Sequence, residues 1–85
     1  HMGWNSLTIE KTDNPLFVGF KQDEFVYFVH SYYADTVPDF TLTTTQYICP
    51  FASTVGNGNV FGVQFHPEKS GATGLRLLNN FIGLV

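Results

Sequence analysis

The stretch FGVQFHPEKS, residues 61–70, places a histidine, a proline and a glutamate directly after an apolar run. Side chains of an extended segment alternate between two faces, and this run predicts a strand that ends at His66. Pro67 fixes its own φ and keeps His66 out of helical geometry, so the chain leaves the strand in a defined direction. Glu68, two residues later, can then fold back toward the imidazole.

A histidine held by a carboxylate is the base half of a nucleophile, base and orienter arrangement. The carboxylate fixes the tautomer of the ring and stabilises the imidazolium that forms when the base takes a proton. His66 and Glu68 are therefore candidate catalytic residues. The alternative is a loop histidine that is hydrogen-bonded near the start of a helix, and the residues alone leave both interpretations open.

The sequence offers no clear nucleophile for such a base. Cys49 lies in the segment YICP, without the flanking glycines that form the sharp strand-to-helix turn of an exposed nucleophile. We expect it to be a buried, inert thiol. Ser31, Ser53 and Ser70 also lack such a turn around them.

Length and composition restrict the class of protein. With 85 residues, the chain is at most one small domain or part of a larger one. The 44% hydrophobic content indicates a packed state, and nine Phe, four Tyr and one Trp exceed what a small core readily hides. We therefore expect some apolar surface to contact another polypeptide. The net charge of −3, without a basic cluster, argues against a nucleic-acid partner.

The chain shows no signal for a membrane or a metal. No apolar run reaches the length of a membrane span, and the N-terminus lacks the pattern of a signal peptide, so we expect a cytoplasmic protein. The single cysteine excludes an internal disulfide and a thiolate zinc site. Because the spacings of His1, His30 and His66 match no recognised ligand pattern, we expect neither a metal nor a cofactor.

Several segments before the histidine are extended by pattern. The residues Gly3-Trp4-Asn5 are expected in a structured loop, and the alternation in residues 7–10 predicts a short strand. Residues 16–20 form either a strand or one helical turn, and the pattern does not decide between them. Residues 25–33 are the most strand-like, and their two apolar faces predict cover on both sides, as inside a layered α/β fold.

A hairpin and a helix are predicted for the second half of the chain. Residues 42–48 form another extended candidate. The turn signal GNGN at residues 56–59 joins residues 51–55 to residues 60–65 as a hairpin, so the histidine lies on its second arm.

The last part of the chain has helical periodicity. Ser70 is a plausible N-cap, and Leu75, Leu78 and Ile82 recur at helical spacing, with Leu77, Phe81 and Leu84 beside them. We expect this C-terminal helix to pack one broad face onto the sheet. Extended strands, a hairpin and a terminal helix together predict an α/β fold.

The motif FGVQFHPEKS resembles the C-terminal signature of the class I (triad) glutamine amidotransferases. The match is broader in combination: HMGWN at residues 1–5, FVHSYY at residues 28–33, GNVFGVQFHPEKSG at residues 58–71 and GLRLLNNFIGL at residues 74–84. This combination is most similar to the glutaminase subunits of imidazole glycerol phosphate synthases. The subunits that serve anthranilate or GMP synthesis share the His-Pro-Glu but are less similar elsewhere.

The resemblance implies a flavodoxin-like α/β domain of which residues 1–85 are the C-terminal portion. In that family the cysteine nucleophile and the glycine-rich oxyanion loop lie upstream of the Gly-Trp-Asn segment, and neither is present in these residues. Cys49 does not match the nucleophile. We therefore expect this chain to be inactive alone and to require the N-terminal half of its own domain.

The resemblance also implies residue roles. His66 would be the general base and Glu68 its orienter, and Ser31 and Tyr32 would line the site for the substrate L-glutamine. Five residues match positions at the interface with the cyclase subunit, to which ammonia is passed: Met2, Trp4, Asn5, Tyr27 and Lys69. Core packing is the alternative for Trp4 and Tyr27, and a solvated charge is the alternative for Lys69.

The implied function is hydrolysis of L-glutamine to glutamate and ammonia for a synthase of histidine biosynthesis. Two alternatives remain open at this point. The chain is an amidotransferase part of another synthase, such as anthranilate or GMP synthase, or it is a self-associating or domain-swapped interaction module. The second alternative follows because strands without their neighbours present edges that pair with another copy.

Overall fold

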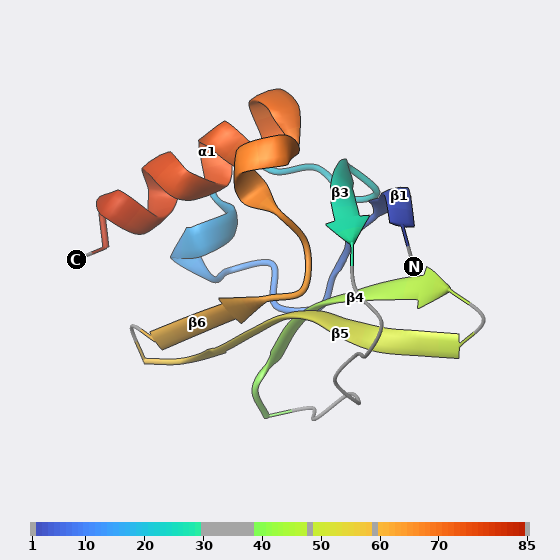
Figure 1. Cartoon of the computed structure of the whole chain (residues 1–85). Helices are drawn as coiled ribbons and strands as arrows, with labels where there is room; N and C mark the ends of the chain where they lie inside the picture. Colours follow the sequence, from blue (N-terminus) through green and yellow to red (C-terminus); the bar gives the residue numbers. More distant parts are fainter. Residues whose placement is uncertain (1, 30–38, 48, 59, 85) are drawn as a thin grey trace.

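The structure of this chain is a computed structural model, and it describes residues 2–29, 39–47, 49–58 and 60–84. Within these ranges the chain forms six strands, two 3-10 turns and one α-helix (Figure 1). In chain order they are β1 (Met2–Ser6), β2 (Thr8–Ile9), η1 (Pro15–Phe17), β3 (Phe25–Val29), β4 (Thr41–Tyr47), β5 (Cys49–Asn57), β6 (Val60–Val63), η2 (Pro67–Lys69) and α1 (Gly71–Ile82). Mixed strands and a C-terminal helix confirm the predicted α/β class.

The described strands form two antiparallel sheets. The larger sheet has the order β2-β4-β5-β6, and the smaller one pairs β1 with β3. In Figure 1 the larger sheet lies below, while α1 and the β1–β3 pair lie above it. The loop expected at Gly3-Trp4-Asn5 is wrong, because this segment is strand β1. Its register places Trp4 opposite Tyr27, and such cross-strand aromatic pairs stabilise a sheet.

The predicted hairpin is present between β5 and β6. Asn57 pairs with Val60, and Gly58 between them has a φ of +64°, which a residue without Cβ adopts readily. The undecided segment at residues 16–20 begins as a 3-10 turn instead of a strand. The side chain of Asn14 caps this turn, because its Oδ1 accepts a hydrogen bond from the backbone N–H of Leu16 at 3.0 Å.

The segment that carries the histidine passes from one sheet to the other. Strand β6 ends at Val63, and Phe65 then forms an isolated antiparallel bridge with Phe28 of β3. The chain therefore leaves the larger sheet at Gln64 and reaches the smaller sheet one residue later. This change of partner brings His66 beside β3 and not to the end of a continuous β6 strand.

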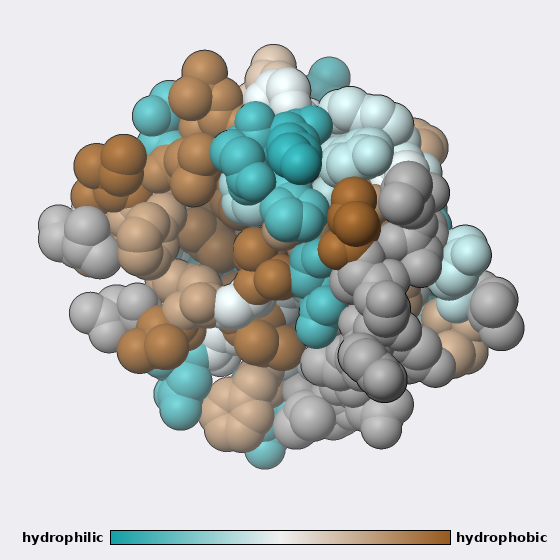
Figure 2. All heavy atoms as spheres, viewed as in Figure 1, coloured by the Kyte–Doolittle hydropathy of each residue, from teal (hydrophilic) through white to brown (hydrophobic). Residues whose placement is uncertain are grey.

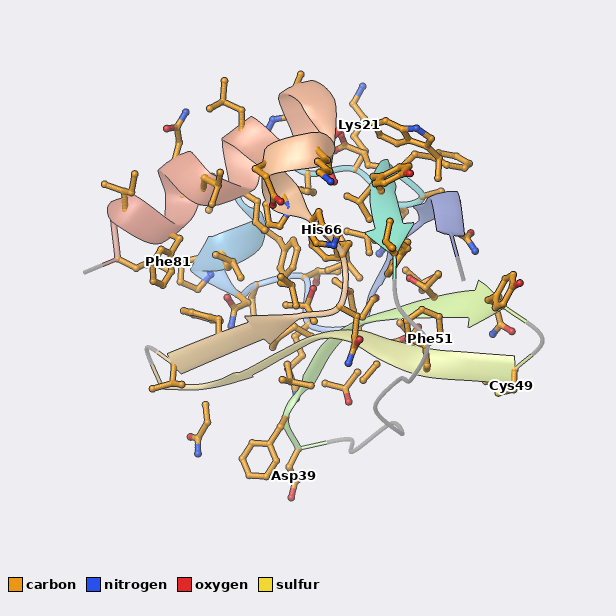
Figure 3. All side chains as sticks on the ribbon, viewed as in Figure 1. Lys21, Asp39, Cys49, Phe51, His66 and Phe81 are labelled. Atoms are coloured by element: carbon orange, nitrogen blue, oxygen red, sulfur yellow. The ribbon has the colours of Figure 1, made fainter. Side chains whose placement is uncertain are left out.

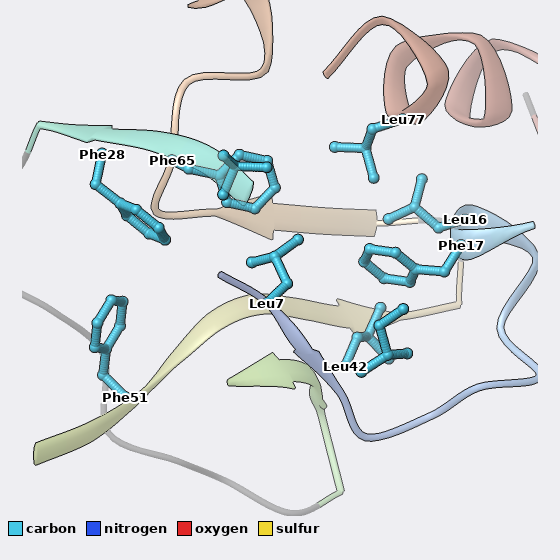
Figure 4. Packing of buried hydrophobic residues seen from close by; sticks show 10 residues of the cluster. Leu7, Leu16, Phe17, Phe28, Leu42, Phe51, Phe65 and Leu77 are labelled. Carbon is cyan, nitrogen blue, oxygen red and sulfur yellow. The ribbon is translucent and has the colours of Figure 1, made fainter. Parts of the chain in front are cut away.

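The core lies between the two sheets and the helix (Figure 4). Phe28 is fully buried, and its ring packs edge-on against Phe51 at 5.6 Å and against Phe65 at 5.8 Å between centroids. It thereby joins both sheets to the histidine segment. The prediction that β3 is covered on both faces is wrong for the described residues, because Phe25 and Val29 on its other face are 55% and 40% exposed.

Helix α1 buries only part of its predicted broad apolar face. The stripe of Leu75, Leu78 and Ile82 faces outward, and Leu77 is the buried leucine of the helix. The reason is a close approach to the turn η2: a Cβ on Gly74 would overlap the carbonyl oxygen of Pro67. Because position 74 has no side chain, the helix lies with this face against the histidine segment.

Glu24 attaches the helix to the loop that precedes β3. Arg76 Nη1 donates to both carboxylate oxygens at 3.0 Å, and Thr73 Oγ1 donates to one of them at 3.1 Å. Desolvation raises the pKa of Glu24, but the hydrogen bonds from the Lys21 backbone N–H, Arg76 and Thr73 outweigh it and hold the pKa below its ordinary value. The ionised carboxylate of Glu24 is the form that binds Arg76 and Thr73 of the helix.

Candidate active site

His66 lies at the point where the extended segment turns into η2 (Figure 3). Its backbone is extended, with φ −101° and ψ 100°, and Pro67 begins the 3-10 turn, as the sequence predicts. The backbone N–H of His66 donates to the carbonyl oxygen of Tyr27 at 2.8 Å. The main chain of the histidine is therefore attached to β3.

Glu68 folds back onto the imidazole, which confirms the predicted contact. His66 Nδ1 lies 3.0 Å from Glu68 Oε2, and the two side chains are 39% and 60% exposed. The hydrogen bond from the backbone N–H of Glu68 itself holds the pKa of this carboxyl below its ordinary value, helped by His66 and Lys69 against a desolvation cost. Glu68 is thus an ionised acceptor beside the ring.

The contact at Nδ1 decides which ring nitrogen is available for chemistry. When Nδ1–H is donated to the carboxylate, Nε2 is the nitrogen that can accept a proton. Within the described ranges Nε2 of His66 has no hydrogen-bond partner. The arrangement can therefore act as a general base toward a group placed on the Nε2 side.

The predicted interface residues separate into two groups. Trp4 and Tyr27 share the outer face of the β1–β3 pair, with ring centroids 5.7 Å apart in an edge-on arrangement, and Trp4 is 54% exposed. Met2 pairs with Val29 at the end of the same ladder, and Lys69 is exposed at the end of η2. Core packing is thus not the role of Trp4.

Asn5 is not brought to this aromatic face. Side chains alternate along β1, and the Asn5 Nδ2 atom donates to the backbone oxygen of Gln46 in β4 at 2.9 Å. Asn5 Oδ1 accepts from the backbone N–H of Ser6 at 2.8 Å. The amide therefore links the smaller sheet to the larger one.

The remaining candidates lie elsewhere. Ser31 and Tyr32 lie outside the described residues. Cys49 is the first residue of β5, at the end of the β4–β5 hairpin and away from His66 (Figure 3), and it is half-buried where a buried thiol was expected. The thiol of Cys49 is therefore not part of the arrangement around His66.

The described residues show neither a metal cluster nor a membrane-spanning helix. In the part of the chain that the structure describes, no three His, Cys, Asp or Glu side chains lie close enough together to hold a metal ion. No helix among these residues is long and apolar enough to cross a membrane.

An apolar groove runs between α1 and β6. It encloses about 150 Å³ and is lined by Leu16, Phe61, Val63, Pro67, Leu77, Leu78 and Phe81. Figure 2 shows apolar side chains gathered over these two elements with a hollow between them. Val60, Leu75 and Ile82 extend this exposed apolar surface, since they are 72%, 60% and 65% exposed. The described residues therefore present this groove and the aromatic face of β1 and β3 as apolar surfaces.

The family model for class I glutamine amidotransferases matches residues 1–84. The chain belongs to this family. The amidotransferase chain is 56% identical over 84 residues to imidazole glycerol phosphate synthase subunit HisH of Methanosarcina acetivorans, a match that covers 96% of this chain and 41% of that relative. Subunit HisH of Bacteroides thetaiotaomicron is also 56% identical over 84 residues, with 99% of this chain and 41% of the relative covered.

A relative with lower identity gives the same result. The amidotransferase chain is 49% identical over 85 residues to subunit HisH of Archaeoglobus fulgidus, covering all of this chain and 43% of the relative. The chain thus spans about two fifths of the length of the curated relatives that it matches.

One residue beside the histidine has a role that sequence reasoning missed. Ser70 occupies the N-cap position of α1, as predicted, but its side chain makes no capping hydrogen bond. The hydroxyl instead contacts the backbones of Tyr27 and His66. The signal that suggested a cap, a serine before a helical pattern, does not distinguish these two uses of the hydroxyl.

Proposed function

We propose that this chain supplies the general base and its orienter to a glutaminase. The observation that carries the proposal is the 3.0 Å contact between His66 Nδ1 and Glu68 Oε2, which leaves Nε2 for the reacting groups. Membership in the class I amidotransferases and the similarity to HisH subunits support the same reading.

In the proposed reaction a cysteine from the remaining part of the domain attacks the side-chain amide of L-glutamine. His66 Nε2 takes the thiol proton and then gives it to the departing ammonia, while the glutamyl group forms a thioester with the cysteine. Water next attacks the thioester, again with the imidazole as base, and glutamate leaves as the thiol is restored. A single imidazole suits both directions of proton transfer, because one ring nitrogen can accept a proton as a base and return it as an acid.

The substrate site and the partner belong to the proposal as well. Ser31 and Tyr32 line the glutamine site. The product ammonia passes to the cyclase subunit of imidazole glycerol phosphate synthase in histidine biosynthesis, because ammonia released into bulk water would be protonated and lost as a nucleophile. The exposed aromatic face around Trp4 and Tyr27 is of the kind that is covered at subunit interfaces.

The apolar groove between α1 and β6 accepts the remaining part of the domain. The relatives have more than half of their length outside the match, and the groove is lined almost wholly by apolar side chains. If the groove is covered in this way, residues 1–85 alone self-associate with rising concentration in size-exclusion chromatography, whereas the chain joined to that remaining part does not. Equal self-association of both proteins would contradict this placement.

The experiment that tests the function uses a joined protein, in which residues 1–85 are combined with the part of the Methanosarcina acetivorans relative that lies outside the match. We expect the joined protein to release ammonia from glutamine, with a rate that rises when the cyclase subunit is added. Absence of glutaminase activity in a folded joined protein that binds the cyclase would overturn the proposal.

The aromatic face gives a separate prediction. Replacing Trp4 by alanine in the joined protein should weaken binding to the cyclase subunit about thirtyfold, because exposed tryptophans at interface centres carry a large part of the binding energy. Isothermal titration calorimetry measures the change. Phe40, which is 45% exposed and precedes β4, is the matched control, and Phe40→Ala should leave the affinity within about twofold. Equal affinities for both variants would remove Trp4 from the interface.

A further inference from the structure

The hydroxyl of Ser70 is inserted into the pairing between β3 and the histidine segment. Ser70 is only 2% exposed, and its Oγ accepts from the backbone N–H of Tyr27 at 2.9 Å. The same hydroxyl donates to the backbone oxygen of His66 at 2.6 Å. The backbone N–H of His66 in turn donates directly to the oxygen of Tyr27 at 2.8 Å. Tyr27 and His66 are thus joined by one direct hydrogen bond and one that runs through a side chain.

This arrangement differs from ordinary strand pairing. In an antiparallel ladder, the two residues of a hydrogen-bonded pair exchange both backbone hydrogen bonds directly. Here the second direct bond is replaced by two bonds through the hydroxyl of Ser70, the residue just before α1. The carbonyl of His66 also accepts from the backbone N–H of Lys69 at 3.0 Å, whereas the N–H of Tyr27 depends on Ser70. Loss of the hydroxyl therefore loosens the Tyr27 side of the bridge.

The exposed ion pair cannot by itself hold the imidazole in one place. The side chain of Glu68 is 60% exposed, and pairs of this kind restrict their partners only weakly in water. The position of the ring depends on the backbone of His66, which the buried hydroxyl contacts. The close approach of Gly74 to the carbonyl of Pro67 presses the same helix turn against this segment.

We propose that Ser70 is a positioning residue for His66, which it ties to Tyr27 and to the start of α1 through one buried hydroxyl. The inference rests on the proposed glutaminase function, because it assigns to Ser70 the placement of the proposed base. Ser70 touches neither the substrate nor the reacting atoms in this role. Its effect should appear in the chemical step and not in the binding of glutamine.

The test compares two variants of the joined protein. Ser70→Ala removes the hydroxyl, and Ser70→Cys keeps nearly the same shape but offers only a weak donor and acceptor. We expect both to lower kcat for ammonia release by about tenfold to a hundredfold, since small displacements of a catalytic group have effects of this size. KM for glutamine should stay within about twofold. If Ser70→Ala does not fold, Ser70→Cys gives the same comparison.

A matched control separates positioning from general stability. Ser53 is fully buried, and its hydroxyl forms a 2.8 Å hydrogen bond with Thr43 Oγ1 within the larger sheet. Ser53→Ala should keep the kcat of the unchanged joined protein. Amide hydrogen exchange adds a readout that does not depend on activity. The Tyr27 N–H should exchange about tenfold faster in Ser70→Ala than in the unchanged joined protein. The Leu7 N–H, which donates to the backbone oxygen of Glu24, should keep its exchange rate.

The outcomes separate the two proposals. If His66→Ala loses activity but Ser70→Ala and Ser70→Cys keep the full kcat, the positioning role is overturned and the glutaminase function stands. A fall in kcat that Ser53→Ala shares equally would also overturn the positioning role. Retention of activity by His66→Ala would instead overturn the function itself.

Discussion

Replacing His66 by alanine in the joined protein is expected to lower the rate of ammonia release from glutamine by at least about a thousandfold. The imidazole is the group that moves a proton in both halves of the proposed reaction, and His66 is the only histidine within the described ranges. A steady-state assay that couples released ammonia to the oxidation of NADPH measures the rate, and circular dichroism shows whether the variant is folded.

A pair of carboxylate variants refines this test. Glu68→Gln should lower kcat less than His66→Ala does, because an amide oxygen still accepts a hydrogen bond from Nδ1 but no longer stabilises the imidazolium. Glu10 is an exposed acid whose Oε2 accepts from Thr44 Oγ1 at 2.8 Å, and Glu10→Gln is the matched control with unchanged kcat. If Glu10→Gln and Glu68→Gln behave alike, Glu68 is not an orienter.

The pH dependence follows from the lowered pKa of Glu68. A carboxyl with a lowered pKa keeps its charge until the pH falls below its ordinary value of 4.5, so the interaction with His66 is present above that pH and is lost only in more acidic solution. A loss of activity between neutral pH and about pH 5 is therefore not caused by protonation of Glu68. Between neutral pH and about pH 5, the activity of the Glu68→Gln variant should therefore change with pH in the same direction as that of the unchanged joined protein.

Replacing Phe28 by alanine is expected to destabilise the joined protein by about 3–5 kcal/mol. Phe28 is fully buried, and the alanine variant leaves a cavity where two edge-on contacts, with Phe51 and Phe65, are lost. Urea denaturation, followed by tryptophan fluorescence, measures the change in the free energy of unfolding. A domain of this size has a total stability on the order of 5–10 kcal/mol, so the variant is close to unfolding.

The control for Phe28 lies on the same strand. Phe25 is 55% exposed on the opposite face of β3, and Phe25→Ala should change the free energy of unfolding by less than about 0.5 kcal/mol. The comparison keeps the residue type and the strand constant and changes only burial. A cost below about 1 kcal/mol for Phe28→Ala would show that the two sheets are not held together through this ring.

Features that depend on neighbouring residues were predictable from the sequence. The hairpin at Gly58 follows from turn chemistry, and the extended backbone of His66 follows from the proline after it. The contact between His66 and Glu68 also belongs here, since two residues separated by one proline have few ways to arrange their side chains. The helical periodicity of residues 75–82 predicted α1 for the same reason.

Features that depend on distant segments were not predictable. The helix turns Gly74 and Leu77 inward because it packs against η2, whereas periodicity alone did not show which part of the broad apolar face would be buried. The transfer of the chain between sheets at Gln64 is set by the bridge from Phe65 to β3. The use of the Ser70 hydroxyl depends on Tyr27, 43 positions earlier in the chain, and no local pattern reports such a contact.

The close approach at Gly74 has a consequence for mutations of its codon. Every nucleotide change that alters the amino acid at this codon adds a side chain, and a Cβ there would overlap the Pro67 carbonyl, next to the proposed base. Any such side chain would therefore force the helix or the turn η2 to shift, and with it the segment that carries His66. A mutation at a position away from the proposed reaction would in this way reach the proposed base.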